Sequence, residues 1–130
     1  MNYRALPLIA LISVAASILA CSSEPASTPD AGGGGSVNGC TTYADQTAAG
    51  GAITWDFTVA PKCVKVKVGQ TVTWTGDFAT HPLAPFNGDA SNPIVIGTAG
   101  TSKITFPVAG TFGFHCLNHP SMLGAVQVVP

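Results

Sequence analysis

Phe-Gly-Phe-His-Cys-Leu-Asn-His-Pro-Ser-Met is the sequence from Phe112 to Met122, and it joins a strand pattern to three unusual donor atoms. Cys116 is followed three residues later by His119, and Met122 comes three residues after that. Successive side chains of a strand point to opposite faces, so Phe112, Phe114 and Cys116 should share one face. We therefore expect Cys116 to end a strand with its sulfur in a dry core, and His119 and Met122 to lie on the turn that follows.

The donor atoms of this stretch suit copper. A thiolate, an imidazole and a thioether are soft or borderline ligands, and two His and one Cys with a long axial Met are the signature of a blue-copper electron-transfer site. The sequence contains three His. His115 adjoins Cys116 and should point to the opposite face of the strand, so His81 is the candidate for the second imidazole. We predict one type 1 copper ion held by His81, Cys116 and His119, with Met122 as axial ligand.

Other chemistries fit the same residues less well. Structural zinc is usually held by four Cys or His ligands, whereas this sequence offers one free Cys and two well-placed His. A thiol nucleophile activated by His lacks an evident third residue that would orient the base. The Cys-x-x-Cys-His motif of a c-type haem is absent from the sequence. A buried Cys116 thiol without any metal remains the plain alternative.

The body of the chain alternates between apolar and polar residues with a period of two, which is typical of strands with one buried face. Phe57 shares its parity with Ile53 and Trp55, and we expect it to be buried. Gly69-Gln70 lies between two alternating runs and predicts a tight hairpin. The expected strands are residues 53–59, 64–68, 72–75, 93–96, 103–106, 111–116 and 125–129. About seven short strands separated by Gly and Pro, with no helical period, predict an all-β sandwich or small barrel.

On these residues the sequence resembles the cupredoxins, which are small β-sandwich copper proteins. The segment from Cys116 to Met122 is similar to the short Cys-x-x-His-x-x-Met ligand loop of the plastocyanin and amicyanin branch. The segment from Val66 to Trp74, followed by His81, is similar to the family's hairpin before its first His ligand. The segment from Pro107 to Cys116 is similar to the family's approach to the Cys. The resemblance covers most of residues 53–130 and implies a cupredoxin-like Greek-key β-sandwich.

The resemblance also implies a function, namely a one-electron carrier that alternates between Cu(I) and Cu(II) and transforms no substrate. A copper carrier or buffer that uses the same ligands is the alternative. By family analogy, electrons pass through the exposed edge of His119. If the two loops lie at one end of the sandwich, the apolar residues at 82–86 and 120–123 form a rim that suits docking of a redox partner protein, and ordinary packing of the loops is the alternative. Gly76 departs from the family, because many relatives carry near this place an Asn that locks the ligand loops.

The enzyme and nucleic-acid classes are disfavoured by composition. Multicopper oxidases and copper nitrite reductases reuse this domain, but they need further His for a second copper centre. This sequence has three His in total, so we predict that the protein is not an enzyme. The formal net charge is −1 and no basic stripe is present, so nucleic-acid binding is not indicated.

Residues 1–21 have the pattern of a secretory signal peptide, with Arg4 near the start and an apolar run from residue 6 to residue 20. The run ends in Ile-Leu-Ala-Cys21, which resembles a bacterial lipobox, where the Cys is lipidated and becomes the new N-terminus. The sequence therefore predicts a protein anchored by lipid to a membrane on the periplasmic side of a bacterial cell envelope. Cleavage without lipidation, leaving a secreted or periplasmic protein, is the alternative.

Residues 22–39 are rich in Gly, Pro and Ser and predict a flexible spacer, and residues 40–130 then form the folded domain. The sequence contains four Cys. With Cys21 assigned to the lipid and Cys116 to the metal, Cys40 and Cys63 remain. A signal sequence implies an oxidising compartment, so we expect these two to form a disulfide. Two free buried thiols are the alternative.

Overall fold

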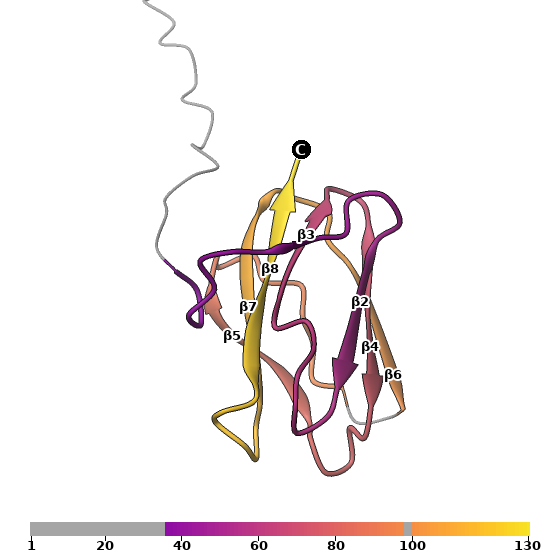
Figure 1. Ribbon diagram of the computed structural model, residues 1–130, viewed down its shortest axis with the longest axis vertical. Helices are drawn as coiled ribbons and strands as arrows, with labels where there is room; N and C mark the ends of the chain where they lie inside the picture. Colours follow the sequence, from indigo (N-terminus) through magenta and orange to yellow (C-terminus); the bar gives the residue numbers. More distant parts are fainter. Residues whose placement is uncertain (1–35, 98–99) are drawn as a thin grey trace, which may run out of the picture.

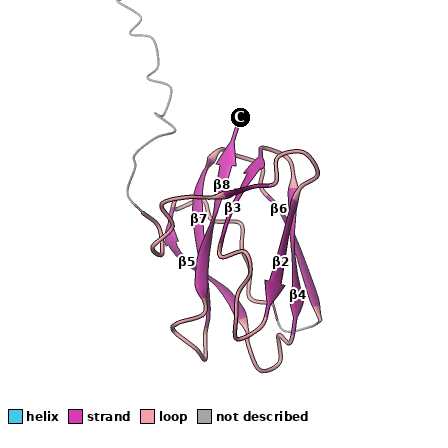
Figure 2. Cartoon of the chain, in the orientation of Figure 1, coloured by secondary structure: helices cyan, strands magenta, loops and turns pink. Residues whose placement is uncertain are grey.

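The computed structural model describes residues 36–97 and 100–130 of the 130-residue chain. Within this part the chain forms eight strands and no helix, which confirms the predicted all-β class (Figure 2). No helix there is long and apolar enough to cross a membrane. The predicted signal peptide, the lipidation site Cys21 and most of the predicted spacer at residues 22–39 lie outside the described residues.

The strands form two sheets that face each other as a sandwich (Figure 1). One sheet has the order β1-β3-β8-β7-β5, and the other has the order β2-β4-β6. Strands β1 and β3, β3 and β8, and β2 and β4 pair in parallel, whereas the other pairs are antiparallel. The strands are β1 (Ala44–Asp45), β2 (Gly51–Trp55), β3 (Cys63–Lys67), β4 (Thr71–Gly76), β5 (Leu83–Gly88), β6 (Thr101–Thr105), β7 (Gly110–Cys116) and β8 (Leu123–Val129).

Large aromatic side chains fill the space between the two sheets. Trp55, Trp74, Phe112 and Phe114 are all fully buried. The rings of Trp55 and Trp74 both meet Phe114 edge to face, at centroid distances of 5.8 and 5.5 Å. Cys116 belongs to the same buried cluster as Phe112 and Phe114, as its parity on the strand predicts. The core therefore continues under the end of β7 and keeps the Cys116 sulfur away from water.

One predicted strand is absent, and one observed strand was not predicted. Residues 93–96 form no strand, and Ile94 is buried while Val95 and Ile96 are 65% and 60% exposed. Strand β5 was not predicted, because Pro85 interrupts the alternating pattern there. Its pairing with β7 also shifts register. Pro cannot donate a ladder hydrogen bond and is tolerated in edge strands, and β5 is an edge strand of the five-stranded sheet.

The predicted hairpin at Gly69-Gln70 is also wrong, although the turn itself is tight. Gln70 N donates to Lys67 O at 3.0 Å, and Gly69 has a φ of +82°, which glycine adopts without strain. Strands β3 and β4 on either side of this turn nevertheless lie in different sheets. An alternating pattern specifies which side chains face the core but not which strand is the neighbour, so the sequence did not reveal this crossing.

Phe57 is not part of the core, in contrast to the prediction from its parity. Strand β2 ends at Trp55, and Phe57 is 64% exposed on the loop that follows. The Asp56 carboxylate accepts a hydrogen bond from the Phe57 backbone N–H at 2.7 Å. A short polar side chain that bonds the local backbone competes with the sheet ladder, which gives a physical reason for the end of the strand here.

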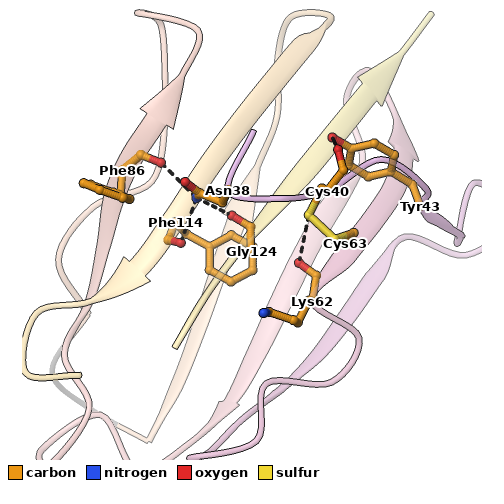
Figure 3. Close-up of a disulfide and its surroundings, with 8 residues drawn as sticks. All are labelled: Asn38, Cys40, Tyr43, Lys62, Cys63, Phe86, Phe114 and Gly124. Atoms are coloured by element: carbon orange, nitrogen blue, oxygen red, sulfur yellow. Dashed lines mark hydrogen bonds between the residues drawn. A yellow bond between two sulfur atoms is a disulfide. The ribbon is translucent and has the colours of Figure 1, made fainter. Parts of the chain in front are cut away.

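The segment just before β1 is fastened to the five-stranded sheet (Figure 3). The predicted disulfide between Cys40 and Cys63 is present. Asn38, which lies in the predicted spacer at residues 22–39, contacts this sheet. The side-chain amide nitrogen of Asn38 lies 3.1, 3.2 and 2.8 Å from the carbonyl oxygens of Phe86, Phe114 and Gly124.

We predict that replacing both members of the disulfide, as in the Cys40→Ser/Cys63→Ser variant, lowers the free energy of unfolding by about 3 kcal/mol, because the unfolded chain gains the freedom of an open loop. Urea denaturation of the variant and the wild type measures this difference. Wild-type protein unfolded under reducing conditions is the matched control and should lose the same amount. An unchanged midpoint in both would contradict a stabilising role for the disulfide.

Candidate metal centre

The predicted metal ligands come from two loops at one end of the sandwich, the lower end in Figure 1. Cys116 is the last residue of β7, and His119 and Met122 lie on the loop that connects β7 to β8. His81 lies on the loop between β4 and β5. The β2–β3 loop, which carries Phe57, reaches the same end.

The structure brings His81, Cys116 and His119 together. The Nδ1 atoms of the two imidazoles are 3.0 Å apart. The Cys116 sulfur lies 3.8 Å from His81 Nδ1 and 3.6 Å from His119 Nδ1. The three donor atoms thus lie within 4.8 Å of one another, close enough to share one metal ion.

The chemistry of these donors fits copper better than structural zinc. Two imidazole nitrogens and one cysteine sulfur make the trigonal set of a blue-copper site, whereas structural zinc usually has four Cys or His ligands. Cys116 is 1% exposed and His81 is 7% exposed, while His119 is only partly buried. A metal held here would therefore be shielded on the Cys116 side and closest to solvent at His119.

Met122 is buried beside this cluster. It is 1% exposed and belongs to the core. The Cys116 N–H donates to Met122 O at 2.8 Å, and the Met122 N–H donates to His119 O at 2.9 Å. These two bonds fold the loop back on itself, so Met122 returns to the level of Cys116 with its side chain in the apolar interior.

Three successive backbone carbonyls around His81 each accept a hydrogen bond from another part of the chain. The pairs are Asn118 Nδ2 to Thr80 O at 2.9 Å, Trp55 Nε1 to His81 O at 2.6 Å, and Leu117 N to Pro82 O at 3.0 Å. Two of the donors lie between the ligands Cys116 and His119. The loop that carries one imidazole is therefore tied directly to the loop that carries the other.

Asp77 shapes the start of the His81 loop. Its carboxylate accepts hydrogen bonds from the backbone N–H groups of Ala79 and Thr80 at 3.0 and 3.2 Å. Its carbonyl oxygen accepts from the His81 N–H at 3.0 Å. Hydrogen bonds from the side chain and backbone of Thr80 lower the pKa of Asp77. The loop is thus preshaped by a residue that the sequence analysis did not single out.

Gly76 lies too close to the neighbouring strand to carry a side chain, so the Asn expected near this place from the sequence resemblance would not fit here. A Cβ atom at Gly76 would overlap the carbonyl oxygen of Trp55 on the neighbouring strand. The Asn118 hydrogen bond to Thr80 O connects the two loops, whereas the hydrogen bonds of Asp77 stay within the His81 loop. The signal for Asn118 was present in the sequence, as an amide side chain between two ligands, but its acceptor lies 38 residues away.

Some residues of the predicted apolar rim do not lie at the surface. Leu83, Ala84 and Met122 are buried in the interior and present no surface to a partner. The exposed apolar residues near His119 are Phe57, which is 64% exposed, Leu117, which is 50% exposed, and Pro120. The Phe57 ring lies edge to face against His119, with a centroid distance of 5.4 Å, which places it at the ligand itself.

His115 is directed away from the cluster, as its parity predicts. Its ring stacks on Phe86 of β5, with the centroids 4.4 Å apart and the planes 24° apart. Burial lowers the pKa of His115, because desolvation disfavours the charged imidazolium. His115 is therefore part of an apolar contact on the outer face of the sheet.

The sequence is 41% identical over 69 residues to amicyanin from Paracoccus denitrificans, covering 48% of this chain and 52% of amicyanin. The chain thus spans about half the length of this curated relative. No family model matches the sequence.

The structural comparison finds copper proteins with the same fold. The reduced state of an amicyanin variant superimposes with a TM-score of 0.50 and 28% identity, covering 62% of this chain and 82% of amicyanin. The copper-containing nitrite reductase of Thermus scotoductus SA-01 gives a TM-score of 0.54 at 20% identity, covering 62% of this chain and 22% of the reductase. The purple cupredoxin of Nitrosopumilus maritimus gives 0.48 at 24% identity, covering 61% and 99%.

The two-sheet sandwich is a cupredoxin-like fold, as the sequence resemblance implies. Over the residues that match, its sequence is similar to that of amicyanin.

We predict that Asn118→Ala releases the His81 loop, because the Thr80 carbonyl loses its partner from the ligand loop. A hydrogen bond of this kind contributes about 1 kcal/mol, so amide hydrogen exchange at His81 should rise about fivefold. NMR-detected exchange on the metal-free protein measures this change. Asn92→Ala is the matched control, since it removes an amide-to-carbonyl bond of 2.8 Å to Gly113. Equal protection of His81 in both variants would contradict the role of Asn118.

Proposed function

We propose that this protein is a type 1 copper-binding protein that carries single electrons in a bacterial cell envelope. The observation that carries the proposal is the convergence of His81, Cys116 and His119, whose donor atoms lie within 4.8 Å of one another at one end of the sandwich. The similarity to amicyanin supports the same conclusion. Copper bound by these residues would supply one-electron chemistry between Cu(I) and Cu(II).

The role of each ligand follows from its surroundings. His81, Cys116 and His119 would hold the copper ion, and the buried Met122 would supply a thioether as the fourth ligand. The carbonyl groups around His81 are held by donors from two other segments, so its loop has little freedom to move. A ligand set that keeps its shape suits both oxidation states, and this rigidity is what the chain contributes to rapid electron transfer.

The partly exposed His119 marks the place where electrons enter and leave. Phe57, Leu117 and Pro120 form an exposed apolar surface around it. An apolar patch at a redox site suits brief docking of another protein, so we assign the redox partner to this face. This surface replaces the rim expected from the sequence, and Pro120 is the member that the two have in common.

We propose that the protein is not an enzyme. A second copper centre would need further imidazoles, and the three His of the chain are accounted for by His81, His119 and the outward-facing His115. The nitrite reductase matches over 22% of its own chain and supports the fold alone.

The proposed location follows from the N-terminal sequence. Residues 1–21 act as a lipoprotein signal, Cys21 carries the lipid, and the following residues hold the domain off the membrane surface on the periplasmic side. Radiolabelled palmitate incorporated by the wild type, and not by Cys21→Ala, would test the anchor. A wild-type protein that takes up no label would assign it to the secreted or periplasmic alternative.

We predict that the wild type turns blue with Cu(II) and that Cys116→Ser is colourless, because the intense visible band needs the copper–thiolate bond. A visible spectrum of each protein after Cu(II) addition measures this difference. Retained colour in Cys116→Ser would contradict the ligand assignment. A colourless wild type that binds only Cu(I) would favour the copper carrier or buffer instead.

We predict that Met122→Leu still binds copper but changes its midpoint potential, because the axial ligand tunes the potential of such sites while the other three hold the metal. Copper content and voltammetry measure the two effects. Complete loss of copper, or an unchanged potential, would count against an axial role for Met122.

A further inference from the structure

Phe57 is a large aromatic side chain whose position the core does not explain. It is 64% exposed, although its parity with Ile53 and Trp55 would have allowed burial. Its ring lies edge to face against both candidate imidazoles, with centroid distances of 6.2 Å to His81 and 5.4 Å to His119 and an interplanar angle of 67° in each case. The side chain therefore leaves the sandwich and covers the metal cluster.

The short segment from Trp55 to Phe57 contacts His81 in two places, its backbone carbonyl and its imidazole ring. The Trp55 indole N–H donates to the His81 carbonyl oxygen from inside the core. The Phe57 ring packs on the His81 imidazole from outside. Between them, Asp56 fixes the Phe57 backbone through its carboxylate. The last residue of β2 and the loop that follows it thus restrain the backbone and the ring of His81, a candidate ligand on the β4–β5 loop.

The contact is more important for His119, because that imidazole is the less buried of the two. Edge-to-face aromatic pairs contribute about 0.5–1.5 kcal/mol beyond the area that they bury. A ring in this position restricts rotation of the imidazole and removes water from one side of it. Both effects act on the ligand through which electrons are proposed to pass.

We propose that Phe57 is a positioning residue of the metal centre: its ring fixes the His119 imidazole and sets the polarity around it, and thereby tunes the reduction potential. This proposal rests on the proposed function of the site. It assigns to Phe57 a task beyond contact with a redox partner, and it predicts effects in the isolated protein where no partner is present.

The chain contains a matched pair for comparison. Phe86 is also an exposed phenylalanine, at 40%, and its ring also packs on a histidine, His115. His115 lies outside the cluster of donor atoms. Substitution of Phe86 therefore removes an exposed phenylalanine ring that also packs on an imidazole, here stacked rather than edge to face, without touching a candidate ligand.

The experiment compares Phe57→Leu, Phe57→Tyr and Phe86→Leu with the wild type. Leu keeps apolar volume but removes the aromatic ring, and Tyr restores the ring. In the metal-free proteins, NMR measures solvent exchange of the His119 imidazole N–H, which should rise about 2- to 12-fold in Phe57→Leu, as the energy of an aromatic pair implies. In the copper-loaded proteins, voltammetry should give a changed midpoint potential for Phe57→Leu alone.

Each outcome has a defined meaning. Changes in imidazole exchange and potential that occur in Phe57→Leu, are reversed in Phe57→Tyr and are absent in Phe86→Leu support the proposal. Unchanged values in Phe57→Leu, or equal changes in Phe86→Leu, overturn it. If the wild type takes up no copper, the proposed function fails. The NMR measurement on the metal-free protein then still decides whether Phe57 positions His119.

Discussion

The structure depends on how the backbone around His81 is held. Its three successive carbonyls, from Thr80 to Pro82, accept hydrogen bonds from the ligand loop and from Trp55 in the core. Buried or half-buried carbonyls that lack partners are costly, so these bonds favour one arrangement of the two loops. His81 and Cys116 are 35 residues apart in the sequence, and this arrangement brings their donor atoms to 3.8 Å.

The hydrophobic core supports the same end of the molecule. Phe112, Phe114 and Cys116 lie on the inner face of β7, and Met122 returns to that face after the loop. The strand that carries the sulfur is thus packed against Trp55 and its neighbours. Ordinary core packing is enough to keep the Cys116 thiol away from water. Close packing of this kind resists small movements, which is the property that a carrier with two oxidation states needs.

Two parts of the surface have different roles. One holds the N-terminal segment on the sheet, and the other exposes the candidate metal site. Asn38 and the disulfide of Cys40 hold the N-terminal segment on the five-stranded sheet, close to β7 and β8. At the end of the sandwich that carries the candidate metal site, Phe57 and Leu117 remain exposed beside His119. These two exposed apolar side chains lie where the proposed electron path reaches the surface.

Sequence alone determined what depends on local spacing. The donor types Cys116, His119 and Met122, the parity of β7 and the all-β class are all set by neighbours along the chain, and a count of Cys and His led to the disulfide and to His81. Tertiary structure alone decided the rest. It turned Phe57 outward, made an edge strand of β5, and gave Asn118 its partner. Alternation fixes which way a side chain faces, but the strand or carbonyl that it meets comes from a distant segment.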